Sequence, residues 1–339
     1  MRSITLLLLS LAILAGGCGS SQRDNNQKEN DQSKKRVLFD TDTNNELDDQ
    51  HALAYLLFNG DVFDVEGITV NATPNGGKIE KQYAEARRVM QMCGVFREIP
   101  LHKGANGTFY EIKDNLESKS FDGSEAVHFI IDQALKDAKR KLILLPVGKL
   151  TNIALALKKE PEIAKKVRIV WLGSNYPEPG EYNQDADTAA MNYILNQEVP
   201  FEIVTVRYGK PSGTAAVTVT KKQILSKMPG KGPHVSTSVK GRHGDIFDNF
   251  GNYSVNLFKN ADMHGDPPSR SLFDMAAVAI VKNPGWAESK EIAAPILIDN
   301  KWRERPDNSR KITIWEHFDK KNIISDFFET MNAPKIANQ

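Results

Sequence analysis

The stretch VLFDTDTNNELDDQHALAYLL, residues 37–57, decides the fold of this chain. It opens with three apolar residues, which predict a short buried strand, and from Asp49 onward its apolar residues recur at helical spacing. The carboxylates Asp40, Asp42 and Asp48 lie between the two patterns, at the end of the strand and the start of the helix. Open α/β folds bind their ligands at this position. The stretch therefore predicts both an α/β fold and a ligand site.

Four aspartates within ten residues repel one another unless a cation neutralises them. A hard divalent ion with oxygen ligands is the natural partner of such a cluster. Helix capping and a solvated turn would account for one or two of the four side chains, but not for all of them. We therefore predict a divalent metal site in this stretch.

The rest of the chain alternates between short apolar runs and helical patterns. Strands are predicted at 63–70, 99–102, 167–172 and 201–206, with two further β-like runs within 292–315. Helices are predicted at 78–93, 124–135, 248–259, 271–280 and 318–331, and a strand, a turn and a helix at 142–157. We find no internal repeat. This alternation predicts a single α/β domain, residues 36–339, whose mostly parallel central sheet is flanked by helices.

Composition and charge set limits on the class of protein. The chain has 339 residues, of which 40 % are hydrophobic and 26 % charged, as in ordinary soluble domains. Its net charge of +1 gives no reason to expect a nucleic acid partner. The sequence leaves open whether the chain forms a homo-oligomer.

The first residues are similar to a bacterial lipoprotein signal peptide. Residues 1–17 contain a basic residue, an apolar run too short to span a bilayer, and small residues directly before Cys18. We predict that Cys18 becomes a lipidated N-terminus and that residues 18–35 form a polar tether. The mature chain, with no transmembrane helix, would then be anchored in the bacterial cell envelope, facing the periplasm or the surface. The alternative is a plain secretory signal with an incidental cysteine.

Three further motifs follow in order along the chain. The turn Pro146-Val147-Gly148 follows an apolar strand, the polar segment 173–190 contains Glu181-Tyr182-Asn183, and Asp274 lies in the first turn of a predicted helix. With the opening stretch, these motifs resemble the inosine-uridine preferring nucleoside hydrolase family, calcium-dependent enzymes that cleave N-ribosides. The loop TNNEL between Asp42 and Asp48 is longer than the three residues usual in that family, so its register stays open.

The resemblance implies a set of metal ligands and a catalytic base. Ca²⁺ would be held by Asp42, Asp49, Asp274 and the backbone carbonyl of Val147. Asp42 would also take the proton from a metal-bound water that attacks the N-glycosidic bond. The expected products are ribose and the free base.

The resemblance also implies a substrate site. Asp48, Glu181 and Asn183 would hold the ribose hydroxyls, since carboxylate and amide groups together supply acceptors and donors. Leu172 would line the site, and Asp40 would support the residues around the metal. An asparagine after the second strand would reach the substrate; we assign this role to Asn71, with Asn75 as the alternative.

The leaving-group side departs from the family. Many pyrimidine-active relatives have a histidine directly before the last aspartate, where this chain has Phe273. An acid would have to come from His243, His264, Tyr208 or Tyr253, or the base would stack on Phe247, Phe250 or Tyr253. Stacking favours protonation of a purine from solvent, so we predict a purine or an unusual riboside as substrate.

Two other functions remain open at this stage. The segment 37–43 loosely fits a haloacid dehalogenase-type phosphatase, in which Asp40 would be the nucleophile and the ion Mg²⁺. The later motifs have no role in that interpretation. The second alternative is a non-catalytic, calcium-dependent nucleoside- or sugar-binding lipoprotein that keeps the site but lacks an acid.

Overall fold

The opening stretch forms strand β1 (Lys35–Thr41) and helix α2 (Asp48–Leu57), as predicted. Side chains alternate across β1, because successive residues of a strand point to opposite faces. Val37 and Phe39 pack into the hydrophobic core on one face of the sheet, and Leu38 packs into the core on the other. β1 is therefore buried on both sides, and the acidic loop leaves from the middle of the molecule.

The computed structural model describes residues 34–45, 47–136 and 138–339. The predicted signal peptide, Cys18 and all but the end of the tether lie outside these residues. The folded unit begins at Lys35, one residue before the predicted boundary. The Lys35 ammonium donates hydrogen bonds to the carbonyls of Val281 at 2.7 Å and Lys282 at 2.8 Å, which explains why this residue belongs to the fold.

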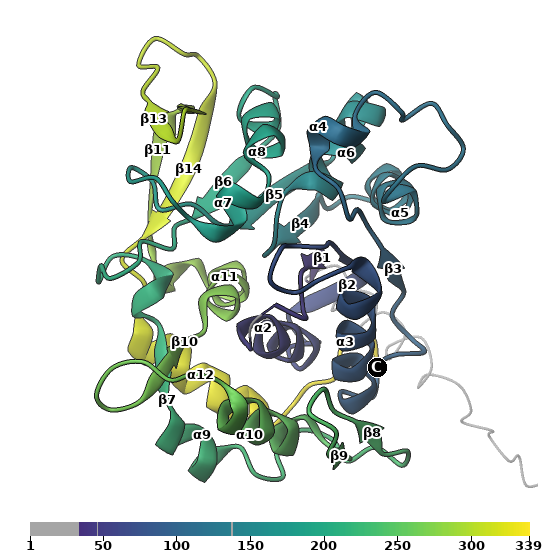
Figure 1. The fold of residues 1–339 in the computed structure, drawn as a ribbon, viewed down its shortest axis with the longest axis vertical. Helices are drawn as coiled ribbons and strands as arrows, with labels where there is room; N and C mark the ends of the chain where they lie inside the picture. Colours follow the sequence, from purple (N-terminus) through teal and green to yellow (C-terminus); the bar gives the residue numbers. More distant parts are fainter. Residues whose placement is uncertain (1–33, 46, 137) are drawn as a thin grey trace, which may run out of the picture. The chain divides into compact units, whose positions relative to one another are not determined.

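The central sheet has eight strands in the order β11-β14-β6-β5-β4-β1-β2-β3 (Figure 1). Neighbouring strands run parallel, except that β11 is antiparallel to β14. The strands not yet given are β2 (Phe63–Val70), β3 (Leu101–Lys103), β4 (Leu142–Pro146), β5 (Val167–Leu172), β6 (Phe201–Val204), β11 (Glu288–Ala293) and β14 (Lys311–Glu316). The predicted α/β class with a mostly parallel sheet is confirmed.

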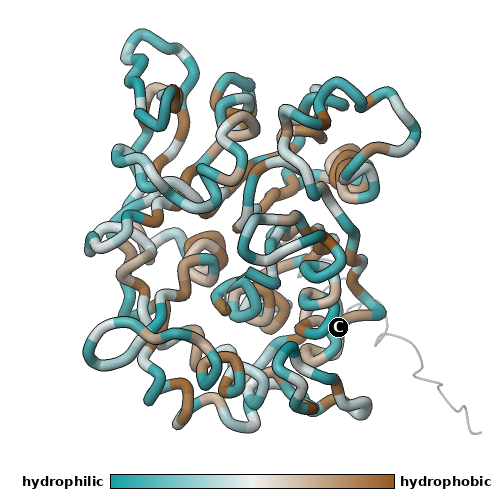
Figure 2. The backbone as a smooth tube through the Cα atoms, in the orientation of Figure 1, coloured by the Kyte–Doolittle hydropathy of each residue, from teal (hydrophilic) through white to brown (hydrophobic). Residues whose placement is uncertain are grey.

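Helices cover both faces of the sheet. One core is completed by α2, α3 (Ile79–Met92), α10 (Phe250–Asn260), α11 (Phe273–Lys282) and α12 (Lys320–Asn332). The other is completed mainly by α5 (Ser124–Leu135), α6 (Thr151–Lys159) and α8 (Thr188–Leu195). Hydrophilic residues dominate the outer loops, including the one that precedes β14 (Figure 2). No helix of the described residues is both long and apolar enough to cross a bilayer.

The smaller elements lie outside the central sheet. They are the helices α4 (Phe109–Ile112), α7 (Tyr182–Ala186) and α9 (Lys221–Lys227), and the strands β7 (Thr218–Thr220), β8 (Val239–Lys240), β9 (Ile246–Phe247), β10 (Ser269–Ser271), β12 (Ile296–Ile298) and β13 (Lys301–Arg303). The first β-like run of 292–315 is divided between the end of β11 and the hairpin β12–β13. The sequence pattern does not show which residues join the central sheet and which form the separate hairpin.

Helices α2 and α11 pack against each other near the centre of the domain (Figure 1). Behind them, the ring of Phe327 on α12 lies 5.9 Å from the ring of His51 and 6.3 Å from that of Tyr55, both on α2. Phe327 is fully buried. Its ring therefore supports the helix that carries the acidic motif.

We predict that Phe327→Ala lowers the free energy of unfolding by about 3–5 kcal/mol, because it leaves a cavity beneath α2. Urea unfolding followed by circular dichroism measures the change. Phe328→Ala is the matched control, since Phe328 is only partly buried and packs on the edge of the same core. Equal losses in the two variants would contradict the supporting role of Phe327.

Candidate active site

A cavity of about 340 Å³ opens where β1, β4 and β5 end, and we call it the main cavity. The carboxyl ends of parallel strands meet at one edge of a sheet, which is where such folds bind ligands. Its acidic residues come from the predicted motifs. The lining residues are Asp42, Asn45, Asp48, Asp49, Asn75, Val147, Leu172, Glu181, Tyr182, Asn183, Val206, Tyr208, His264, Arg270, Ser271, Phe273 and Asp274.

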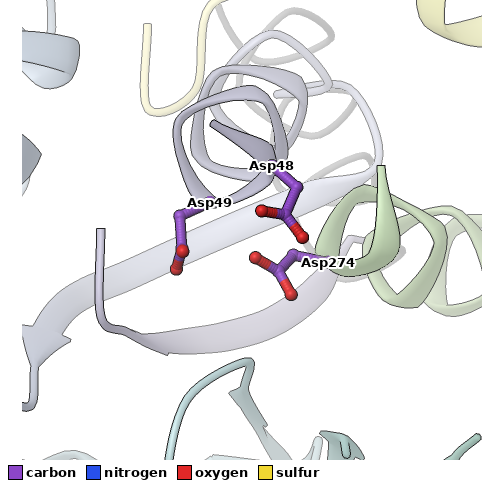
Figure 3. Close-up of side chains that lie close together, drawn as sticks. All are labelled: Asp48, Asp49 and Asp274. Atoms are coloured by element: carbon purple, nitrogen blue, oxygen red, sulfur yellow. The ribbon is translucent and has the colours of Figure 1, made fainter. Parts of the chain in front are cut away.

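Three carboxylates converge in this cavity from two helices. Asp48 and Asp49 lie in the first turn of α2, and Asp274 lies in the first turn of α11. One oxygen from each lies within 4.8 Å of the others (Figure 3). Helix N-termini carry partial positive charge, which favours carboxylates at these positions. The two helix ends thus concentrate negative charge at one point.

The electrostatics of this cluster favour a bound cation. Burial raises the pKa of Asp42 to about 6 and that of Asp48 to about 7. Burial and repulsion from the neighbouring carboxylates raise the pKa values of Asp49 and Asp274 well above the ordinary value. A divalent ion would relieve both effects, and an all-oxygen donor set suits a hard ion such as Ca²⁺ or Mg²⁺. The residues therefore fit a metal site.

Hydrogen bonds from threonine hydroxyls orient two of the carboxylates, those of Asp42 and Asp49. The Thr73 hydroxyl donates to Asp42 at 2.5 Å, and the Thr41 hydroxyl donates to Asp49 at 2.5 Å. Asp42 lines the main cavity but lies outside the tightest group of carboxylates, which contains Asp48 in its place. The structure thus brings Asp42, Asp48, Asp49 and Asp274 to one cavity, and Asp48 replaces Asp42 in the tightest group.

Asp40 is fully buried and does not line the main cavity. Its carboxylate accepts hydrogen bonds from the side-chain amides of Asn71 at 2.7 Å and Asn152 at 2.9 Å. Burial raises its pKa to about 7. Asn71 is thereby held against Asp40, whereas Asn75 lines the cavity. A buried Asp40 cannot act as a nucleophile on a substrate in this cavity, so the phosphatase alternative is wrong.

The turn after β4 places a backbone carbonyl at the cavity wall. The carbonyl of Val147 accepts a hydrogen bond from the side-chain amide of Asn183 at 2.8 Å, and that amide also contacts the carbonyl of Leu172 at 3.2 Å. A methyl group on Gly148 would lie 2.8 Å from an oxygen of Asp42 and from the Asn71 amide. This turn therefore needs glycine, because two functional side chains approach its backbone closely.

Glu181 is held rigidly at the start of α7. Its carboxylate accepts hydrogen bonds from the backbone N–H groups of Ser174 and Gln184, both at 2.8 Å. Burial raises its pKa to about 7. Because Glu181 and Asn183 both line the main cavity, the structure places this pair beside the acidic cluster, as the motif predicts.

The main cavity is also lined by Tyr208, His264, Arg270 and Phe273. The rings of Tyr208 and Phe273 meet edge to face at 5.9 Å. Two of the four acid candidates, Tyr208 and His264, therefore lie at the cavity. His243 does not line it.

The prediction that the base stacks on Phe247, Phe250 or Tyr253 is wrong. Phe250 and Tyr253 are fully buried in the core, where Phe250 packs on His51 and the Tyr253 hydroxyl donates to Glu85. Phe247 packs on Tyr253 and does not line the main cavity. The aromatic stripe of α10 faces the core, and the aromatic rings that line the main cavity are those of Tyr182, Tyr208 and Phe273.

Sequence reasoning missed Asn45 and Arg270 as cavity residues. Asn45 lies in the lengthened loop after Asp42, where its register was open. Arg270 lies on β10, which pairs with β7 far away in sequence. Its closeness to Asp274 in the chain was the one signal that could have identified it.

Comparison with known proteins shows to which family the chain belongs. The sequence profile described as "Inosine-uridine preferring nucleoside hydrolase" matches residues 37–325. The chain belongs to this family. It is therefore an N-glycosidase of the nucleoside hydrolase type, and the main cavity is its candidate active site.

Individual relatives are distant. The pyrimidine-specific ribonucleoside hydrolase RihB of Escherichia coli O17:K52:H18 is 23 % identical over 290 residues, which cover 79 % of this chain and 84 % of that protein. A plant nucleoside hydrolase structure superposes with a TM-score of 0.69 at 18 % identity, covering 88 % of this chain and 99 % of the other. For the purine-preferring ribonucleoside hydrolase from Gardnerella vaginalis the TM-score is 0.64 at 19 % identity, with 88 % and 98 % covered. These structures share the fold.

The carboxylate cluster predicts how stability depends on pH and metal. The folded pKa values of Asp42 and Asp48, about 6 and about 7, exceed the unfolded value of about 3.9. The folded state thus binds these protons more tightly, and their contribution to stability is present below about pH 4 and lost as pH rises to about 7. We expect Ca²⁺ to raise the melting temperature more at pH 7.5 than at pH 5.

Differential scanning fluorimetry with Ca²⁺ or a chelator measures this difference. Asp274→Asn is the matched variant, since it removes one charge but keeps the side-chain volume. We expect it to melt at a higher temperature than the unsubstituted protein in chelator and to lose the Ca²⁺-dependent rise. The same rise at both pH values would contradict the account.

Proposed function

We propose that this chain hydrolyses the N-glycosidic bond of a ribonucleoside in a Ca²⁺-dependent reaction. The observation that carries the proposal is the convergence of Asp48, Asp49 and Asp274 within 4.8 Å at the wall of the active-site cavity. Asp42, Asp49, Asp274 and the Val147 carbonyl would hold the ion. When bound, Ca²⁺ would position a water molecule and lower its pKa.

Asp42 is the proposed general base. It lines the cavity, and the hydrogen bond from Thr73 fixes its orientation. It would accept a proton as the oxygen of water bonds to the anomeric carbon and the bond to the base breaks. Water is the only co-reactant, and the products are ribose and the free base.

Asp48, Glu181 and Asn183 are the proposed ribose ligands. The two backbone hydrogen bonds to Glu181 hold its carboxylate in place before substrate arrives. Asn183 donates to Val147 and Leu172, which directs its amide oxygen to accept from a sugar hydroxyl. Asn75, which lines the cavity, is a better candidate than Asn71 for a contact with the substrate. We assign Asn71 and Asp40 together to the support of the metal site.

A purine is the proposed base. Phe273 supplies no proton, but it forms an aromatic wall with Tyr208 on which a base can stack. Tyr208 and His264 are the groups at this wall that could donate a hydrogen bond to the departing base. RihB is named as pyrimidine-specific and the Gardnerella protein as purine-preferring, so the base preference needs direct measurement.

We predict that Asp42→Asn lowers kcat by about a hundredfold to ten-thousandfold, the usual contribution of a general base. Release of reducing sugar from inosine, guanosine, adenosine, uridine and cytidine, with Ca²⁺ or with a chelator, measures the activity and the base preference together. Asp307→Asn, at an exposed site far along the chain, is the matched control and should leave activity unchanged. Chelator-resistant turnover would contradict the metal-dependent reaction, and so would full activity in Asp42→Asn.

We also propose that Cys18 carries the lipid that anchors the protein to a membrane of the cell envelope. We expect Cys18→Ser to abolish incorporation of an alkyne-labelled fatty acid in a bacterial host and to move the protein from the detergent phase to the aqueous phase. Ser20→Ala is the control and should remain labelled. Labelling that persists in Cys18→Ser would contradict the anchor.

A further inference from the structure

Tyr182 lies between Glu181 and Asn183 in the sequence, and its half-buried side chain lines the main cavity. The proposed reaction assigns a role to both neighbours but none to the tyrosine. A tyrosine hydroxyl can both donate and accept a hydrogen bond. The partners of this hydroxyl therefore indicate what Tyr182 does at the site.

The hydroxyl of Tyr182 contacts a loop that is distant in the sequence. It accepts a hydrogen bond from the backbone N–H of Asn75 at 2.9 Å. Asn75 is exposed and lies in the loop 71–78 between β2 and α3. Asn44 makes a second contact with this loop, from its side-chain amide to the carbonyl of Gly76 at 2.8 Å. Removal of the tyrosine hydroxyl should therefore loosen the tip of the loop without releasing it.

The same loop orients the proposed base. Thr73 is buried, and its hydroxyl donates to Asp42 at 2.5 Å. The Thr73 side chain also forms a hydrogen bond with Tyr182. A threonine hydroxyl has one proton, and this one goes to Asp42, so the tyrosine is the donor in its contact with Thr73. The result is one chain of hydrogen bonds, from the Asn75 N–H through the two hydroxyls to the Asp42 carboxylate.

The backbone that carries Tyr182 is held on both sides. Two backbone N–H groups donate to the Glu181 carboxylate, and the Asn183 amide donates to two backbone carbonyls. The tyrosine side chain therefore reaches the loop 71–78 from a fixed turn. A sugar bound by Glu181 and Asn183 would hold the same turn, and through Tyr182 it would also hold the loop that orients Asp42.

We propose that Tyr182 is a positioning residue that couples the sugar site to the general base. Its hydroxyl fixes the loop 71–78 through Asn75 and orients Asp42 through Thr73. Asp42 then keeps one orientation while the sugar is bound. This inference rests on the proposed function, since it takes Asp42 as the base and the two neighbours of Tyr182 as sugar ligands.

Tyr182→Phe tests the inference, because it removes the hydroxyl and keeps the ring. The substrate is p-nitrophenyl β-D-ribofuranoside, whose nitrophenolate leaves without a proton, so that the rate reports the attack of water. At saturating Ca²⁺ we expect kcat to fall about tenfold, as the loss of one hydrogen bond predicts, with KM changed by less than about twofold. An unchanged kcat would overturn the proposal.

Tyr193→Phe is the matched control. Tyr193 is a half-buried tyrosine on α8 that does not line the main cavity. Its ring packs on that of Phe109 at 4.8 Å, and this contact does not involve the hydroxyl. The control variant should therefore keep both kcat and KM.

Variants of Thr73 show whether Tyr182 acts through the chain of hydrogen bonds. Thr73→Val removes the second hydroxyl at nearly constant volume, whereas Thr73→Ser keeps it and should keep most of kcat. We expect Tyr182→Phe combined with Thr73→Val to be no slower than Thr73→Val alone, within about twofold. Losses that add would overturn the proposal, and so would a rise in KM with unchanged kcat in Tyr182→Phe, because both indicate direct contact between the hydroxyl and the substrate.

Hydrogen exchange tests the coupling without turnover. D-Ribose is added to the Ca²⁺-loaded proteins, and mass spectrometry follows amide exchange in a peptide that contains the loop 71–78. We expect ribose to slow this exchange in the unsubstituted protein and in Tyr193→Phe. In Tyr182→Phe the protection should be lost, although calorimetry should show the same affinity for ribose. Equal protection of the loop in Tyr182→Phe would contradict the coupling.

The outcomes separate this inference from the proposed function. If the unsubstituted protein binds ribose but cleaves neither the nitrophenyl riboside nor any nucleoside, the proposed function fails, and the exchange measurement still decides the coupling. If it does not bind ribose, both fail. A lower melting temperature of Tyr182→Phe, with faster exchange across the whole domain, would indicate a structural role and overturn the inference.

Discussion

The main constraint on this structure is the repulsion between buried carboxylates at the start of two helices, which must be offset for the domain to fold. Asp48 and Asp49 on α2 face Asp274 on α11, and all three are buried at the cavity wall, where water screens their charges only weakly. The helix N-termini lower the cost of this arrangement but do not remove it. A divalent ion would turn the repulsion into attraction, so the same residues that oppose folding without metal would hold the two helices together with it.

The scaffold is built to bring these helix ends close. β1 is buried on both faces, and α2 leaves directly from the loop that follows it. Both helices are rich in alanine, including Ala52 and Ala54 on α2, and small side chains allow a short distance between helix axes. The side-chain amides of Asn71 and Asn152 donate hydrogen bonds to the buried carboxylate of Asp40, and these bonds fix the end of β1. The chemistry therefore rests on ordinary packing.

The local pattern of the opening stretch predicted the acidic motif, and the resemblance to the family added the distant residues Val147, Glu181 and Asp274. The order strand, aspartates, helix is encoded within 37–57, so the fold class and the acidic motif could be predicted from it. The aromatic residues of α10 have the same helical spacing whether they face a core or a cavity, which explains the error at Phe250 and Tyr253. Arg270 reaches the site through the pairing of β10 with β7, and no local pattern encodes such a contact.

The acidic cluster joins the beginning of the domain to a helix near its end, since Asp49 and Asp274 are separated by most of the folded chain. Closing so long a loop is entropically costly and belongs to the slow, non-local part of folding. A chain still under synthesis has α2 long before it has α11, and with only the first two carboxylates it lacks the complete ligand set. The ion would therefore bind only the finished domain. Metal binding would then indicate that the domain has completed its folding.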